Sequence, residues 1–191
     1  MNAYKGYERK EQVEWEQLPK NAYVIKLLSA KEEQNKDKTG SYLKVAFDIA
    51  EGEYKDFYKK AFDNNTKEDK KWPNDAVLYL TCPNDSSEQW VIDNFNKFMT
   101  AVEDSNEGYH WNWDESTLKD KLVGAKFYIE QSEYEGKIYD HTKAKWFVAA
   151  QKVRDGKFGK LPTDKLVSSS TTSSSPANEG FKPISDEEIP F

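Results

Sequence analysis

The sequence predicts a mainly β fold of the α+β class, in which five strands are interrupted by a helical insertion between the third and the fourth. Segments that alternate apolar and polar residues recur up to about residue 150, and such alternation is typical of half-buried strands. One longer segment instead repeats its apolar residues at helical spacing. The 6 Trp, 11 Tyr and 10 Phe residues supply the apolar area that a core needs, although the mean hydropathy is only −0.95.

The first three strands are expected at residues 22–30, 41–49 and 54–62. The second has the clearest pattern, because every second residue from Leu43 to Ile49 is apolar and all of them fall on one face. A polar turn that ends at Gly40 separates the first two strands. For residues 54–62 a helix is the rival interpretation.

The helical insertion is expected at about residues 63–121. Its polar first part contains a short extended piece at 77–81, and a helix begins at residues 86–88, where Ser is a good N-cap. That helix ends at residues 106–108, and a short second helix then reaches Leu122. The apolar positions of the long helix are Trp90, Val91, Phe95, Phe98, Met99 and Val102.

The remaining strands are expected at residues 123–129 and 139–153, and Trp111 and Trp113 are expected to anchor the insertion to the strands. This order of elements is that of the OB-fold, a five-stranded Greek-key barrel. The predicted fold is therefore an OB-fold-like five-stranded barrel with a helical insertion between strands 3 and 4, plus a disordered C-terminal tail.

A change in composition near Lys165 ends the domain, which we place at residues 1–165. Residues 166–184 contain the run SSSTTSSS and form a Ser/Thr-rich linker, which is expected to be disordered because it cannot bury enough surface to offset its chain entropy. Residues 185–191 form an acidic and apolar tip. The net charge of −6 hides an uneven distribution, because residues 137–160 contain seven Lys or Arg against two Asp.

No catalytic or metal-binding constellation is recognisable in the sequence. His110, His141 and Cys82 do not have the spacing of metal ligands, and neither a Gly-rich phosphate loop nor a nucleophile elbow occurs. We therefore expect a protein that is not an enzyme and that needs no cofactor or metal. No apolar run is long enough to span a membrane, no signal peptide is recognisable, and the single cysteine fits a reducing compartment, so we expect a cytoplasmic protein.

The last six residues, DEEIPF, resemble the C-terminal motif of bacterial single-stranded DNA-binding proteins, in which a disordered linker joins an acidic run and Ile-Pro-Phe to an OB-fold. The resemblance implies binding of single-stranded DNA (ssDNA) by the domain and capture of partner proteins by the tip. The partner-binding residues would be Asp186, Glu187, Glu188, Ile189, Pro190 and Phe191. The chemistry agrees, because the ring and α-carboxylate of Phe191 suit an apolar pocket beside a Lys or Arg.

The body resembles a family of small proteins encoded by phages of Gram-positive hosts, on the stretches 51–54, 70–75, 108–113 and 121–124. Proteins of that family are encoded near phage replication and recombination functions. The resemblance implies a role in phage DNA metabolism in the cytoplasm of a bacterial host, with replication, recombination or repair proteins as partners of the tip. A homo-oligomer is compatible with the sequence.

Binding of ssDNA without sequence preference needs rings on which bases stack and a cationic groove for the phosphates. The outward faces of the second, third and last strands and the loops of the first and last hairpins offer such groups. The candidates are Lys36, Lys38, Tyr42, Lys44, Tyr58, Lys60, Lys137, Lys143, Lys145 and Trp146. For Tyr42 and Tyr58 core packing is the alternative, whereas Trp146 is expected to be exposed.

The sequence thus predicts a phage-type protein that binds and protects ssDNA without sequence preference. Two other classes stay open. An interaction adaptor or inhibitor of host replication proteins would display the tip without binding DNA. A carbohydrate-binding module would use the same exposed rings, because rings on strands also stack on sugars.

Overall fold

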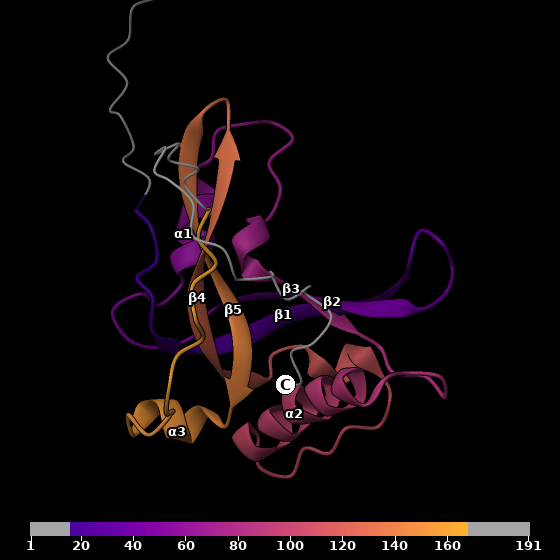
Figure 1. The fold of residues 1–191 in the computed structure, drawn as a ribbon. Coiled ribbons are helices and arrows are strands. Elements are labelled where there is room, and N and C mark those ends of the chain that lie inside the picture. Colours follow the sequence, from indigo (N-terminus) through magenta and orange to yellow (C-terminus); the bar gives the residue numbers. More distant parts are fainter. Residues whose placement is uncertain (1–15, 168–191) are drawn as a thin grey trace, which may run out of the picture.

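The computed structural model describes residues 16–167, which fold around a five-stranded antiparallel sheet in the order β3-β2-β1-β4-β5 (Figure 1). Two long hairpins extend from the body in different directions (Figure 1). The first joins β1 (Ala22–Gln34) to β2 (Ser41–Ile49), and the second joins β4 (Leu122–Tyr134) to β5 (Lys137–Val148). The mainly β architecture is therefore confirmed, and the strand expected at residues 41–49 has the expected bounds.

The prediction of a third strand at residues 54–62 is wrong. The rival interpretation, a helix, is confirmed, because this segment contains most of helix α1 (Phe57–Asn64). Its start is fixed by Asp48, a buried residue near the end of β2. The Asp48 carboxylate accepts hydrogen bonds from the backbone N–H groups of Tyr58 (2.9 Å) and Lys59 (3.0 Å). These N–H groups have no partner inside a helix, so an external carboxylate favours the helix over a strand.

The third strand of the sheet is instead β3 (Val77–Thr81), which lies inside the range expected for the insertion. It follows the short 3-10 helix η1 (Asn74–Ala76) and pairs with β2. The insertion between the third and fourth strands accordingly spans residues 82–121 rather than 63–121. A short extended piece at 77–81 was expected, but its pairing was not.

The long helix of the insertion is confirmed as α2 (Gln89–Ser105), with Val91, Phe95, Phe98, Met99, Ala101 and Val102 as its buried residues. Its end is tied to β4 by Asn106, whose side chain donates to the carbonyl of Val102 and exchanges two hydrogen bonds with the backbone of Leu122. The short second helix is η2 (Glu115–Leu118), and the Asp114 side chain caps it by accepting from Ser116 N–H.

The last strand ends at Val148 instead of Val153, because the chain continues into α3 (Ala150–Arg154). This helix packs on β4 at Gly124, where an added Cβ would lie 2.7 Å from the Val153 side chain and 2.8 Å from the Val148 carbonyl. Only glycine admits so close an approach. The predicted alternation up to Val153 therefore mixed a strand with a short helix.

The core lies between the inner face of the sheet, α1 and α2. Its largest fully buried residues include Phe47, Phe98 and Phe127, one each from β2, α2 and β4. Trp111 packs against this core and its backbone N–H donates to Glu103 of α2, which confirms it as an anchor of the insertion. Trp113 also stacks on Phe95 of α2, but the residue is 71% exposed, so it covers the core only in part.

The sheet is open, because its two edge strands, β3 and β5, do not pair with each other. Closure into a barrel, as the sequence predicts, is thus not observed in residues 16–167. Within the same residues, no helix has the length and apolar character that crossing a membrane requires. The residues of the expected tip, 185–191, and all but the first two of the expected linker lie outside the described part of the chain.

Candidate functional site

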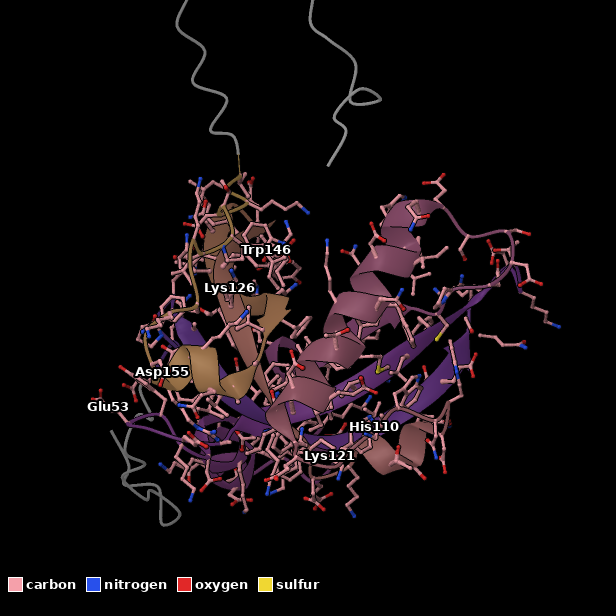
Figure 2. All side chains as sticks on the ribbon, turned by 90° about the horizontal axis from the view of Figure 1, so that it is seen from below. Glu53, His110, Lys121, Lys126, Trp146 and Asp155 are labelled. Atoms are coloured by element: carbon pink, nitrogen blue, oxygen red, sulfur yellow. The ribbon has the colours of Figure 1, made fainter. Side chains whose placement is uncertain are left out.

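A groove runs between the two free edges of the sheet, where β3, the first half of α2 and the paired ends of β4 and β5 face one another. Three large aromatic side chains on its walls are exposed to solvent: Tyr79 (59%) on β3, Trp90 (56%) on α2 and Trp146 (43%) on β5. Each of the three elements therefore contributes one ring. Figure 2 shows Trp146 on the β4–β5 side of the groove, across from α2.

A β-bulge places Trp146 and its neighbour Lys145 in this groove together. Lys126 of β4 pairs with Trp146, and the next residue, Phe127, pairs with Ala144, so Lys145 is the extra residue of β5. Consecutive residues of a regular strand point to opposite faces, whereas a bulge changes the direction of the strand locally. As a result both side chains are exposed and line the groove.

Three lysines, Lys97, Lys126 and Lys145, line the groove, and none of them forms a salt bridge with another residue of the described chain. Lys126 is held in place, because its Nζ donates to the carbonyls of Phe158 (2.9 Å) and Lys160 (3.0 Å). The same Nζ lies 5.2 Å from the centre of the Trp146 ring, which is a cation–π contact. The groove therefore presents three lysines that no carboxylate of residues 16–167 contacts in a salt bridge.

The electrostatic state of Lys126 favours an anionic ligand. Partial burial, and secondly the charge of nearby Lys152, lower the pKa of Lys126 below its usual value. A lowered pKa means that the positive charge is less favourable here than in water. A negative charge beside Lys126 would raise its pKa again, and no carboxylate of residues 16–167 forms a salt bridge with this lysine.

Of the residues predicted to contact DNA, Lys145 and Trp146 lie in the groove, and Tyr42 lies next to it. The Tyr42 and Tyr79 rings are 5.6 Å apart, which extends the aromatic surface onto β2. Lys44 lies on the same outer face, but it faces Glu33 at 3.8 Å, and the Tyr42 hydroxyl donates to the same carboxylate at 2.9 Å. This part of the surface already has its counter-charge.

The other predicted lysines are dispersed. Lys143 donates to Glu130, which Lys165 also contacts at 3.0 Å, and these two hydrogen bonds lower the pKa of Glu130. Lys137 lies at the exposed end of the β4–β5 hairpin. The two lysines of the β1–β2 turn, Lys36 and Lys38, are exposed at the end of the other hairpin.

The prediction that Tyr58 and Lys60 face DNA from a third strand is wrong, because both lie on α1. Tyr58 is buried, and its ring packs edge to face on Phe47 with centroids 5.7 Å apart. It belongs to the core, which was the alternative. Lys60 is exposed on α1, where its Nζ donates to the carbonyl of Lys55 at 2.9 Å.

Four groove residues are not among the DNA contacts predicted from the sequence: Tyr79, Trp90, Lys97 and Lys126. Trp90 was assigned to the apolar stripe of the helix, but it lies at the edge of that stripe and is exposed. Lys97 follows it by seven residues, which is two helical turns on the same face. The alternation of buried Leu78 with Tyr79, and of buried Phe127 with Lys126, could have assigned both residues to the outer face.

The structure also joins the side chains of Ser132, His141 and Asp75 by hydrogen bonds, which their spacing in the sequence does not reveal. His141 Nε2 lies 3.0 Å from Ser132 Oγ, and His141 Nδ1 lies 3.2 Å from Asp75 Oδ2. This chain of hydrogen bonds fastens η1 to the β4–β5 hairpin, and the side chains of His141 and Asp75 are about one third exposed (36% and 31%). Among residues 16–167, no group of three or more His, Cys, Asp or Glu is arranged to hold a metal ion.

Comparison with known proteins adds no assignment, because no family model and no curated protein matches the chain.

Proposed function

We propose that the protein binds single-stranded DNA without sequence preference in the groove between β3, α2 and β5. The observation that carries the proposal is the combination, on the walls of one groove, of three exposed rings and three lysines that form no salt bridge within residues 16–167. Stacking of a base on a ring contributes about 1–3 kcal/mol, so three rings can hold a short stretch of strand. The lysines supply the attraction for its phosphates.

The kind of contact supports binding without sequence preference. Every base has a face that can stack, and phosphates are the same at every position. Reading a sequence requires hydrogen bonds to base edges, and the groove walls offer mainly rings, lysines and apolar side chains, with Asn94 and Thr81 as uncharged polar residues. Duplex DNA shields its base faces by stacking, so the rings favour a single strand.

The topology supports the OB-fold as the framework of this proposal. The order β3-β2-β1-β4-β5, with α2 between β3 and β4, is that of an OB barrel left open between its third and fifth strands. OB-folds are often partly open, and many of them bind nucleic acid on the second and third strands and adjoining loops. In this protein the groove begins at β3 and continues across the open edge to β5.

The acidic tip, residues 185–191, with the partner-binding residues 186–191, completes the proposal as the element that recruits replication, recombination or repair proteins of phage or host. Its support is the sequence resemblance together with the position from which the chain leaves the domain. Lys165 pairs with β4 at Glu130, and Val167 N–H donates to the Gln131 side chain, so the tail starts beside the β4–β5 hairpin. Deleting residues 186–191 should leave the affinity for DNA unchanged or higher at low salt, and it should abolish capture of partner proteins.

Fluorescence polarisation with labelled poly-dT over a salt series, with tryptophan quenching followed in parallel, tests DNA binding directly. We expect affinity that falls as salt rises, and quenching that is reduced in the variant Trp90→Phe/Trp146→Phe. A Kd weaker than about 10⁻⁴ M at low salt would overturn the proposal, because that is no tighter than ordinary non-specific binding to DNA. In that case capture of replication proteins by the tip alone would favour the adaptor, and quenching by oligosaccharides would favour the carbohydrate-binding module.

A further inference from the structure

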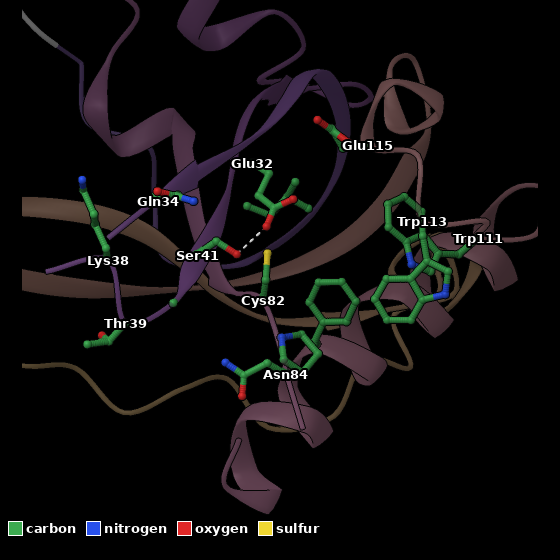
Figure 3. Close-up of a pocket in the computed structure, with 14 residues that line it drawn as sticks. Glu32, Gln34, Lys38, Thr39, Ser41, Cys82, Asn84, Trp111, Trp113 and Glu115 are labelled. Carbon is green, nitrogen blue, oxygen red and sulfur yellow. Dashed lines mark hydrogen bonds between the residues drawn. The ribbon is translucent and has the colours of Figure 1, made fainter. Parts of the chain in front are cut away.

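A second cavity lies on the other side of Phe95 from the groove. It is formed by the end of the β1–β2 hairpin, the segment that joins β3 to α2, and the loop that carries Trp111 and Trp113 (Figure 3). Phe95 lines both the groove and this cavity, so the two are neighbours across one side chain. Phe95 itself is 4% exposed, so it separates the two hollows while keeping them close together in space.

Trp113 is the exposed ring of this cavity. Its ring stacks on Phe95 with nearly parallel planes (11°) and centroids 5.9 Å apart, and it is nevertheless 71% exposed. Its backbone has a φ of +66°, a conformation that costs free energy for a residue other than glycine. Hydrogen bonds around the turn, from Asp114 N–H to Asn112 and from Ser116 to Asp114, hold this conformation. The turn thus presents a large ring to solvent at a local cost.

The polar groups around the cavity suit a planar ligand with acceptors on its edge. The indole N–H of Trp111 is buried and has no hydrogen-bond partner among the described residues, so an acceptor reaches it only if the side chain moves. Ser41, Cys82 and Asn84 add small polar groups to the wall, as Figure 3 shows for the side facing the tryptophans. A nucleobase combines a flat face with carbonyl oxygens and ring nitrogens on its edge.

The charges of this cavity differ from those of the groove. The lining contains one lysine, Lys38, and two glutamates, Glu32 and Glu115, so it has no excess of positive charge. Glu32 also accepts a hydrogen bond from Ser41. A phosphate would find little attraction here, whereas an uncharged base would not be repelled.

We propose that this cavity binds one nucleobase of the strand that occupies the groove, with the base stacked on the open face of Trp113. The inference rests on the proposed function and extends it, because it assigns a second, uncharged part of the binding site. The groove holds the backbone and several bases, and the cavity holds a base that turns away from the strand past Phe95.

The test compares Trp113→Ala with Tyr134→Ala, because Tyr134 at the tip of the β4–β5 hairpin is similarly exposed (66%) and lies outside both cavities. Oligo-dT lengths from about 4 to about 16 nucleotides cover the site sizes of OB-folds. Trp113→Ala should weaken binding of the longer oligonucleotides by roughly five- to 150-fold, the range for loss of one stacked base, and leave the shortest ones unaffected. The loss should not change with salt, since no phosphate contact is removed.

Circular dichroism of both variants checks that they fold. If Trp113→Ala binds every length as well as Tyr134→Ala does, the second cavity does not bind DNA, while the proposal for the groove stands. An equal loss at all lengths also overturns the inference, because it places Trp113 inside the minimal site. If the wild-type chain binds no oligo-dT, the proposed function itself fails.

Discussion

The groove between β3, α2 and β5 and the outer face of β1 and β2 contain the same kinds of residues, yet they differ in what their lysines contact. In the groove, Lys145 lies beside Trp146 and forms no salt bridge with any of residues 16–167. On the outer face of the sheet, Lys44 and Tyr42 both interact with Glu33. The sequence predicts both surfaces as DNA-binding; in the structure they adjoin at Tyr42 and Tyr79, and they differ in that the Glu33 carboxylate contacts the lysine of the second.

The difference matters because binding to a phosphate is an exchange. A lysine without a partner gains a counter-charge when the strand arrives, and mobile ions are released. A lysine beside a glutamate must share its charge, and the carboxylate repels the same phosphate. The contribution of each lysine to affinity therefore depends on its neighbours, so the following predictions compare residues of the two surfaces.

The largest effect is expected for Trp146→Ala. Loss of a stacking ring costs about 1–3 kcal/mol, which corresponds to roughly a five- to 150-fold rise in the Kd for poly-dT. The control Trp146→Phe keeps a ring at the bulge and should retain most of the affinity. Fluorescence polarisation measures both. An affinity for Trp146→Ala equal to that of the wild type would remove the groove as the DNA site.

The matched pair Lys145→Gln and Lys44→Gln tests the role of the carboxylate. Lys145→Gln should reduce the steepness of log K against log salt concentration by about 0.7, the value for one contact with a single-stranded phosphate. Lys44→Gln should leave that steepness nearly unchanged, because Glu33 already neutralises the lysine. Equal losses in the two variants would contradict the distinction between the surfaces.

Glu130→Gln should free Lys143 and Lys165, which Glu130 now neutralises, to bind phosphates. The Glu130 carboxylate, which is ionised at neutral pH, holds Lys143 and Lys165, and their hydrogen bonds lower its pKa below its usual value. Its removal should increase the affinity for poly-dT and raise the salt dependence by about 0.7 for each lysine that reaches a phosphate. The effect should disappear at high salt. A fall in affinity would show that the ion pairs position the hairpin for binding.

The sequence predicted those parts of the fold in which local pattern and tertiary environment agree. The alternation of β2 and the apolar spacing of α2 are examples, since each buries the face that its pattern indicates. The first turn of α1 depends on Asp48, nine residues before the helix begins, and no local pattern reveals that contact. The bulge at Lys145 likewise depends on pairing with β4.

The site was predicted in part for the same reason. Trp146 and Lys145 were found because aromatic and basic residues cluster in the last strand. Tyr79 and Trp90 were not, because they become neighbours of that strand only when the sheet curls toward its open edge and α2 packs there. Which lysines are neutralised depends on partners in other strands, such as Glu33 for Lys44.

The smallest effect on DNA affinity is expected for Tyr58→Phe, at a residue that the sequence analysis placed among the DNA contacts. The Tyr58 hydroxyl is buried and has no hydrogen-bond partner among residues 16–167, and its burial raises the pKa of the phenol. Removing an unsatisfied buried hydroxyl while keeping the ring should raise the free energy of unfolding by about 1 kcal/mol. Urea denaturation measures this change, and the Kd for poly-dT should stay the same. A loss of affinity without a loss of stability would restore Tyr58 to the DNA-binding surface.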